Sequence, residues 1–323
     1  MHKKNSMKKT YLFLLTLVSS LIIFFIVFLQ QEKPTNLIES EQTSTETESL
    51  LTEIETESSI NTETSTETEI VVIPREPLSY LEQCELDYVE QPVTRTREEA
   101  ILKIKELSRW FPALYQVYLN EAQYPDELLR SGAGNPEMTD FLYGYLTRDA
   151  APSGGFTDKE QPEDYPLFLQ WDIRWGYMPY GSANIGATGC GPTCLSMAVF
   201  YLTGNRECTP DVIAQYSLDH DYYVQNVGTA WALLTEYPKE HGLTSTQIRL
   251  SEANLKKQLD KGNILICSVR PGDFTSSGHF IVIYGYDENG FKINDPKCVY
   301  RSRQSWTYEQ IQDDIKNTWS IGK

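Results

Sequence analysis

Cys190 is the residue of this chain best suited to act as a nucleophile, and it stands in the run 189–193, Gly-Cys-Gly-Pro-Thr. An apolar stretch with helical spacing follows, and Pro192 falls in its first turn, where a helix tolerates proline. We therefore expect Cys190 at a helix N-terminus, where unpaired backbone N–H groups and the helix dipole favour a thiolate. Cys194 fits a buried structural cysteine better.

A thiolate needs a proton partner, and His279 is the best placed of the four histidines. His2 lies near the N-terminus, and His220 and His241 sit in polar surroundings. His279 follows Ser-Ser-Gly and begins the predicted strand 279–286, which would hold its ring at the end of a sheet. On this residue alone, a purely structural histidine stays an alternative.

Asp295 ends the next predicted strand, 291–294, which is reached through an Asp-Glu-Asn-Gly turn. A carboxylate there could accept a hydrogen bond from the second nitrogen of the imidazole and fix its orientation. Asn294 and Asp295 cannot both do so, because neighbouring strand residues point to opposite faces. We favour Asp295; the alternative is that it only caps the strand before Pro296.

Gln170 is the candidate second donor to an oxyanion, beside the backbone N–H of Cys190. It lies upstream of the cysteine in the run Leu-Gln-Trp-Asp. An ordinary surface glutamine is the alternative.

The elements that must position these residues form an α+β pattern. We expect a helix over 190–202, helical stretches near 230–237 and 252–261, and strands over 264–269, 279–286 and 291–294. A final helix is expected near 308–317. Together these define a catalytic domain over 163–323.

A helical region precedes that domain, over 76–150, with Thr94 or Thr96 as its first N-cap and a second segment opening at Asn135. It carries no catalytic constellation, so we expect it to pack against or position the domain rather than to have an activity of its own. The Gly-, Pro- and Ser-containing stretch after Ala150 reads as a loop.

The N-terminal residues predict a membrane anchor and a spacer. Residues Tyr11–Leu29 form an uncharged apolar run long enough to span a bilayer, and the lysines before it favour residues 1–10 in the cytoplasm. An uncleaved signal anchor is expected, with a cleaved signal peptide or lipid anchor as alternatives. Residues 30–75 are rich in Thr, Glu and Ser and predict a disordered stalk. The rest would be extracellular.

Charge and cysteine content limit the partners. Net charge is −17, but ten glutamates lie between Pro34 and Pro74, and no basic patch suggests nucleic-acid binding. The six cysteines could form three disulfides outside the cell, yet the spacing of Cys190 and Cys194 suits no mutual bridge, so some thiols should be free. No cofactor or metal is expected; zinc at these two cysteines and His279 would be a weak signature. Oligomeric state is open.

The stretch 167–204, joined with Gly-His-Phe at 278–280 and Asn-Asp-Pro at 294–296, resembles the peptidase C39-like family. The resemblance implies a papain-like fold with Cys190, His279 and Asp295 as a triad and Gln170 at the oxyanion hole. Known members process double-glycine leader peptides within an exporter, but this chain shows no exporter helices or nucleotide-binding motif. It is more similar to stand-alone secreted members.

These observations predict a membrane-anchored extracellular cysteine peptidase that cleaves a peptide or amide bond through an acyl-enzyme. Its partners would be a peptide or cell-wall peptide and, through the N-terminal helix, the membrane. Two alternatives stay open: a cell-wall peptide amidase or transpeptidase with the same triad, and a non-catalytic surface binding module.

Overall fold

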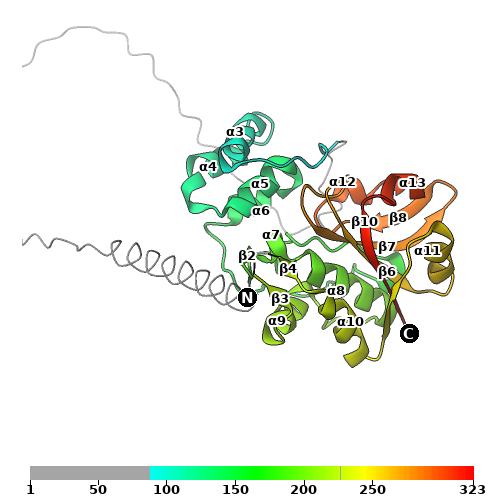
Figure 1. Cartoon of the computed structure of the whole chain (residues 1–323). Helices are drawn as coiled ribbons and strands as arrows, with labels where there is room; N and C mark the ends of the chain where they lie inside the picture. Colours follow the sequence, from blue (N-terminus) through cyan, green and yellow to red (C-terminus); the bar gives the residue numbers. More distant parts are fainter. Residues whose placement is uncertain (1–87, 226) are drawn as a thin grey trace, which may run out of the picture. The chain divides into compact units, whose positions relative to one another are not determined.

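The computed structural model describes residues 88–225 and 227–323, which all belong to one compact unit (Figure 1). The expected anchor at 11–29, the expected stalk at 30–75 and the first part of the expected helical region lie outside these residues. No helix in the described ranges is both long and apolar enough to cross a membrane.

An antiparallel sheet forms the centre of residues 163–323, which were expected to form the catalytic domain and are called the catalytic part below. Its strand order is β5 (Thr244–Ile248), β10 (Ile315–Gly322), β6 (Ile264–Val269), β7 (His279–Asp287), β8 (Gly290–Asn294) and β9 (Ser305–Trp306). Every residue of β6 is buried, as are the first five of β7. Both faces of the central strands are therefore covered.

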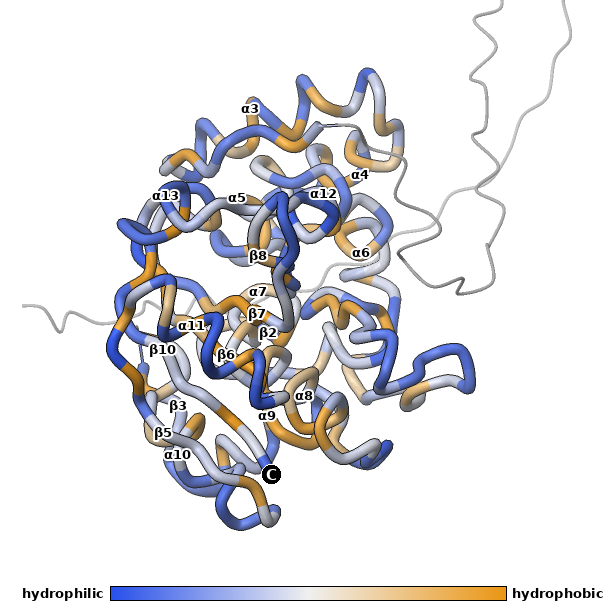
Figure 2. The backbone as a smooth tube through the Cα atoms, turned by 90° about the vertical axis from the view of Figure 1, so that its right-hand side faces the viewer, coloured by the Kyte–Doolittle hydropathy of each residue, from blue (hydrophilic) through white to orange (hydrophobic). Residues whose placement is uncertain are grey.

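Alternate residues of β6 pack into two different cores. Ile264 and Ile266 face the core that contains helix α8 (Cys190–Thr203), whereas Leu265 and Cys267 face a second core with α11 (Glu252–Leu259) and α13 (Tyr308–Ile311). Figure 2 shows the hydrophobic residues gathered along α8 and the central strands. The result is an α+β arrangement with one helix buried against the sheet.

Helix α8 is the most buried helix of the catalytic part, with twelve of its fourteen residues inside. It ends at Gly204, whose φ of 70° is a left-handed conformation that glycine adopts without strain. Around it lie α7 (Ile185–Thr188), α9 (Pro210–Asp219) and α10 (Trp231–Glu240).

The helical region contains α3 (Arg97–Leu107), α4 (Ala113–Leu119), α5 (Asp126–Gly134) and α6 (Thr139–Gly144). Thr96 begins α3 with a capping box completed by Glu99, which confirms one of the two expected N-caps. The core of this region also contains Trp171 and Val299 from the catalytic part. The two parts therefore share one hydrophobic core.

The remaining elements are short: η1 (Glu121–Gln123), η2 (Pro136–Met138), η3 (Pro162–Asp164), β1 (Pro179–Tyr180), β2 (Ala183–Asn184), β3 (Tyr223–Val224), β4 (Gly228–Thr229) and α12 (Val299–Ser302).

The expected helices and strands from 190 to 294 are confirmed, but the expected final helix over 308–317 is wrong. Helix α13 stops at Ile311, and Ile315–Gly322 is a strand that pairs with both β5 and β6. Its segment Asn-Thr-Trp-Ser-Ile alternates weakly and so lacks a clear strand pattern. Pairing on both sides, rather than local sequence, fixes its conformation.

Candidate active site

Cys190 is the first residue of α8 and is half-buried at the surface of a pocket. As a first-turn residue it has no carbonyl partner for its N–H within the helix. The next residue is Gly191. A Cβ at this position would lie 2.7 Å from Thr229, so a larger residue would require the surroundings to move. The chain thus presents the sulfur and an unpaired N–H at one helix end.

His279 begins β7, and its Nε2 lies 2.8 Å from Oδ1 of Asp295. Since a carboxylate only accepts, Nε2 carries the hydrogen, and Nδ1 is left for the interaction with Cys190 that lowers the pKa of that thiol. The histidine is 6 % exposed and the aspartate 0 %. The three side chains therefore interact in the order Cys190, His279, Asp295, with the hydrogen bond between His279 and Asp295 at its buried end.

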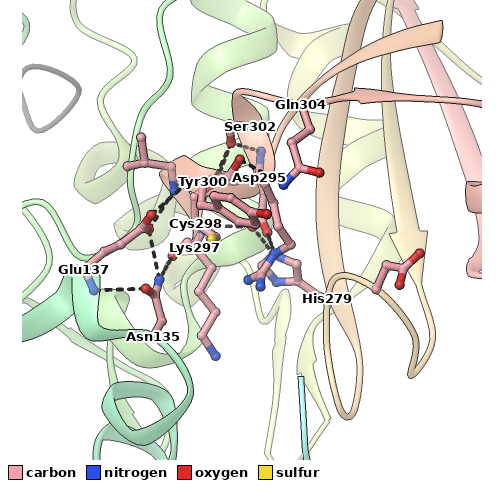
Figure 3. Close-up of polar contacts among 12 residues, drawn as sticks. Asn135, Glu137, His279, Asp295, Lys297, Cys298, Tyr300, Ser302 and Gln304 are labelled. Carbon is pink, nitrogen blue, oxygen red and sulfur yellow. Dashed lines mark hydrogen bonds and ion pairs between the residues drawn. The ribbon is translucent and has the colours of Figure 1, made fainter. Parts of the chain in front are cut away.

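Asp295 is held ionised by a dense set of donors (Figure 3). Its Oδ2 accepts from Nε of Arg301 at 2.7 Å, and its Oδ1 also accepts from the backbone N–H of Lys297 at 2.8 Å. Burial alone would raise the pKa of Asp295, but the charges and hydrogen bonds of Arg301 and His279 outweigh it and hold the pKa well below its usual range. A fixed negative charge thus faces the imidazole.

That charge sets the protonation of the other two groups. Burial opposes the charged form of His279, but the charge and hydrogen bond of Asp295, together with Cys190, raise the pKa of His279 to about 9. Burial also opposes the thiolate of Cys190, yet the hydrogen bond and charge of His279 lower the pKa of that thiol. Both shifts favour the thiolate–imidazolium form of the pair over the neutral form.

Gln170 is 1 % exposed and lines the same pocket as Cys190. Its amide nitrogen donates to the carbonyl of Gly186 at 2.8 Å, which uses one of its two hydrogens and leaves the other. Its backbone N–H donates to the carbonyl of Pro296 at 2.7 Å, so it is tied to the segment after Asp295. The structure places Gln170 in the lining of the pocket that Cys190 also lines, and not on the surface.

Asn294 and the other cysteines have different surroundings. Asn294 Nδ2 donates to Tyr201 Oη at 2.7 Å and to the carbonyl of Tyr165 at 3.0 Å, whereas it is Asp295 that bonds to His279. Cys194 is fully buried, and burial raises its pKa well above the ordinary value. All five cysteines among the described residues are free thiols; Cys84 lies outside them. No cluster of three or more His, Cys, Asp or Glu side chains suited to a metal ion occurs in the described residues.

The helical region supplies two contacts that the sequence did not predict (Figure 3). The carboxylate of Glu137 accepts from the backbone N–H groups of Val299 and Tyr300, both at 2.8 Å. Asn135 Nδ2 donates to the carbonyl of Lys297 at 2.7 Å. These bonds hold the segment that follows Asp295. The only sequence signal was Asn-Pro-Glu as a helix start, which gives no hint of a distant partner.

The pocket has a volume of about 960 Å³ and is built by both parts of the molecule. Cys190, His279 and Gln170 line it from the catalytic part. The helical region adds residues from the segment before α3, including Arg95, and residues from α5 together with Asn135, which directly follows that helix. The pocket is large enough for several residues of a peptide.

Residues 162–322 match the model of the Peptidase_C39 like family. The chain therefore belongs, through these residues, to the peptidase C39-like family of cysteine peptidases. No curated protein matches the chain.

Two solved structures are similar to part of it. One is the peptidase domain of Streptococcus ComA, a bifunctional ABC transporter involved in a quorum-sensing pathway. It is 20 % identical in sequence, the match covers 44 % of this chain and 93 % of that chain, and the TM-score is 0.33. The other is a putative C39-like peptidase from Bacillus anthracis. It is 16 % identical in sequence, the match covers 50 % of this chain and 96 % of that chain, and the TM-score is 0.33.

Proposed function

We propose that this protein is an extracellular, membrane-anchored cysteine peptidase that cleaves a peptide or amide bond, with Cys190 as nucleophile. The observation that carries the proposal is the arrangement at the wall of one peptide-sized pocket: Cys190 and His279 line it, and His279 is hydrogen-bonded to a buried, ionised Asp295. The apolar run Tyr11–Leu29 and the lysines before it support the location.

In the proposed reaction the thiolate of Cys190 attacks the substrate carbonyl carbon. The oxyanion accepts from the backbone N–H of Cys190 and from the remaining amide hydrogen of Gln170. His279 then donates the proton on Nδ1 to the leaving amine, which departs and leaves an acyl-enzyme. Next His279 takes a proton from a water molecule, whose oxygen displaces the thiolate and releases the acid. Asp295 keeps the imidazole oriented throughout.

The test is cleavage of a peptide library by the full chain, with Cys190→Ala and His279→Ala as comparisons. Both variants should fold and lose cleavage, whereas Cys208→Ala, which removes a buried thiol elsewhere, should retain it. Equal cleavage by wild type and Cys190→Ala would contradict the proposal. No cleavage by any form, with peptide still bound, would favour a non-catalytic binding module. Product analysis with an added amine distinguishes hydrolysis from transpeptidation.

A further inference from the structure

The charged residues that line the pocket are mostly positive, although the chain as a whole has a net charge of −17. Five cationic side chains contribute to its lining and one carboxylate, that of Glu127; the cations are Arg95, Arg130, Lys297, Arg301 and Lys316. A lining of one sign concentrates the opposite charge in a cleft. The balance therefore favours a substrate that carries negative charge.

Each arginine in the lining already has a carboxylate partner. Arg95 pairs with Glu90, and Arg130 Nη2 lies 2.8 Å from Oδ2 of Asp126. Arg301 is committed to Asp295. These guanidinium groups support local structure, so the charge available to a ligand resides on the lysines.

The two lysines differ in position. Lys316 is exposed, and its Nζ lies 5.2 Å from the centre of the Trp231 ring, where a cation–π contact occupies it. Lys297 is half-buried. No hydrogen bond or ion pair joins its Nζ to any residue that the structure describes, and Figure 3 shows its side chain extending away from the Asp295 network.

The main chain of Lys297 is, in contrast, firmly held. Its N–H donates to Asp295 Oδ1 at 2.8 Å, and its carbonyl accepts from Asn135 Nδ2 at 2.7 Å and from Trp171 Nε1 at 2.8 Å. Burial, and then the charge of Arg301, lower the pKa of the Lys297 ammonium, and the negative charges of Asp295 and Cys190 offset this only in part. Lys297 and Cys190 line the same pocket, and the positive charge of Lys297 lowers the pKa of the Cys190 thiol.

We infer that Lys297 is a specificity residue that binds a substrate carboxylate next to the scissile bond. This inference rests on the proposed function, because it assigns a substrate class to the same pocket. An anion that enters the pocket supplies the partner that the half-buried ammonium lacks. The carboxylate can belong to an Asp or Glu side chain or to the C-terminus of the peptide.

The first test compares two reagents that alkylate the same sulfur, iodoacetate, which is anionic, and iodoacetamide, which is neutral. Because both react with the Cys190 thiolate, the ratio of their rates is independent of how much thiolate is present. In Lys297→Met the iodoacetate to iodoacetamide ratio should fall about five- to tenfold, as expected for loss of one nearby positive charge. The rates are measured on the folded full chain by mass spectrometry of the Cys190 peptide.

Matched variants give the controls. Lys257→Met removes the same charge from an exposed position on α11, outside the pocket, and should leave the ratio within about twofold of wild type. Lys297→Arg retains the charge and should retain the ratio. An unchanged ratio in Lys297→Met, or a larger fall in Lys316→Met, would overturn the carboxylate site while leaving the thiolate assignment intact. If neither reagent labels Cys190 in the wild type, the proposed function fails and the specificity site fails with it.

The second test identifies the source of the carboxylate. A hexapeptide library with both ends capped and one Glu is compared with the same library carrying Gln, and a library of uncharged peptides with a free C-terminal carboxylate is compared with its amide. We expect one acidic library to be cleaved at least about tenfold faster than its neutral partner, and the preference to disappear in Lys297→Met. Equal cleavage of both pairs by the wild type would contradict the inference.

Discussion

The catalytic part and the helical region differ in how far local sequence indicates their functional residues. Cys190 and His279 each lie in a short, recognisable run at the start of a helix or strand. Asn135 and Glu137 lie in a region without any such signal, yet they bind the segment that follows Asp295. Local sequence therefore identifies the reacting groups, whereas the groups that hold them in place are visible only in three dimensions.

The contacts between the two parts are not a loose surface association. Leu128 and Phe141 of the helical region share a core with Trp171 and Val299 of the catalytic part, and all four are buried. A helical region with an activity of its own would not need to share a hydrophobic core with the catalytic part. The contacts instead support a positioning role for residues 88–148, and the predictions below measure how far each part contributes.

The largest effect is expected inside the catalytic part, from Asp295→Asn. Loss of the carboxylate removes the negative charge that stabilises the His279 imidazolium and fixes its orientation, so kcat/KM should fall about 10³-fold or more. Asn294→Ala is the neighbouring control: it faces Tyr201 and should lower stability but leave the activity of the folded protein within about threefold. A loss below tenfold in folded Asp295→Asn would show that the carboxylate is structural.

The pH dependence is the next largest effect. Burial lowers the pKa of His279, but Asp295 and Cys190 raise it overall to about 9, so the imidazolium is present at neutral pH and is lost as pH rises through about 9. Activity should therefore decline about tenfold per pH unit above that point. The same raised pKa contributes stability that is complete below the unfolded value of about 6.5 and is lost through about 9. An alkaline limb near pH 6.5 would contradict this assignment.

A smaller effect is expected from the helical region, in Glu137→Gln. The N–H groups of Val299 and Tyr300 donate to different carboxylate oxygens, and the amide replaces one of these oxygens by an NH2 group that cannot accept. The free energy of unfolding should therefore fall by about 1–2 kcal/mol. Activity of the folded protein should fall about tenfold because the segment after Asp295 is less well held.

Glu121→Gln is the matched control in the same region, since Glu121 pairs with Arg97 on the surface, away from the pocket. It should change activity by less than about twofold. If the two variants reduced activity equally, the helical region would affect the site only through general stability.

Much of the catalytic part could be predicted from its sequence. The β6 run Ile264–Val269 is continuously apolar, and the Asp-Glu-Asn-Gly turn fixes the register that brings β8 beside β7. The opposite orientations of Asn294 and Asp295 followed from strand geometry alone.

The features that could not be predicted depend on distant partners. β10 is a strand because it pairs on both sides, and Glu137 reaches residues 162 and 163 positions away in the chain. The orientation of Gln170 depends on the carbonyl of Gly186, which no local pattern places beside it. Such contacts are set by tertiary packing and have no periodicity in the sequence.

The rate at which iodoacetamide alkylates Cys190, measured against pH in wild type and in His279→Gln, tests most directly whether His279 holds this sulfur as a thiolate. In the wild type the rate should stay high to a lower pH than in the variant, because His279 lowers the pKa of the Cys190 thiol. In His279→Gln the Cys190 thiol loses the group that lowers its pKa. The alkylation rate should therefore fall about tenfold for each pH unit below the higher thiol pKa of that variant. Identical profiles in the two proteins, or faster labelling of Cys194 than of Cys190, would contradict the assignment.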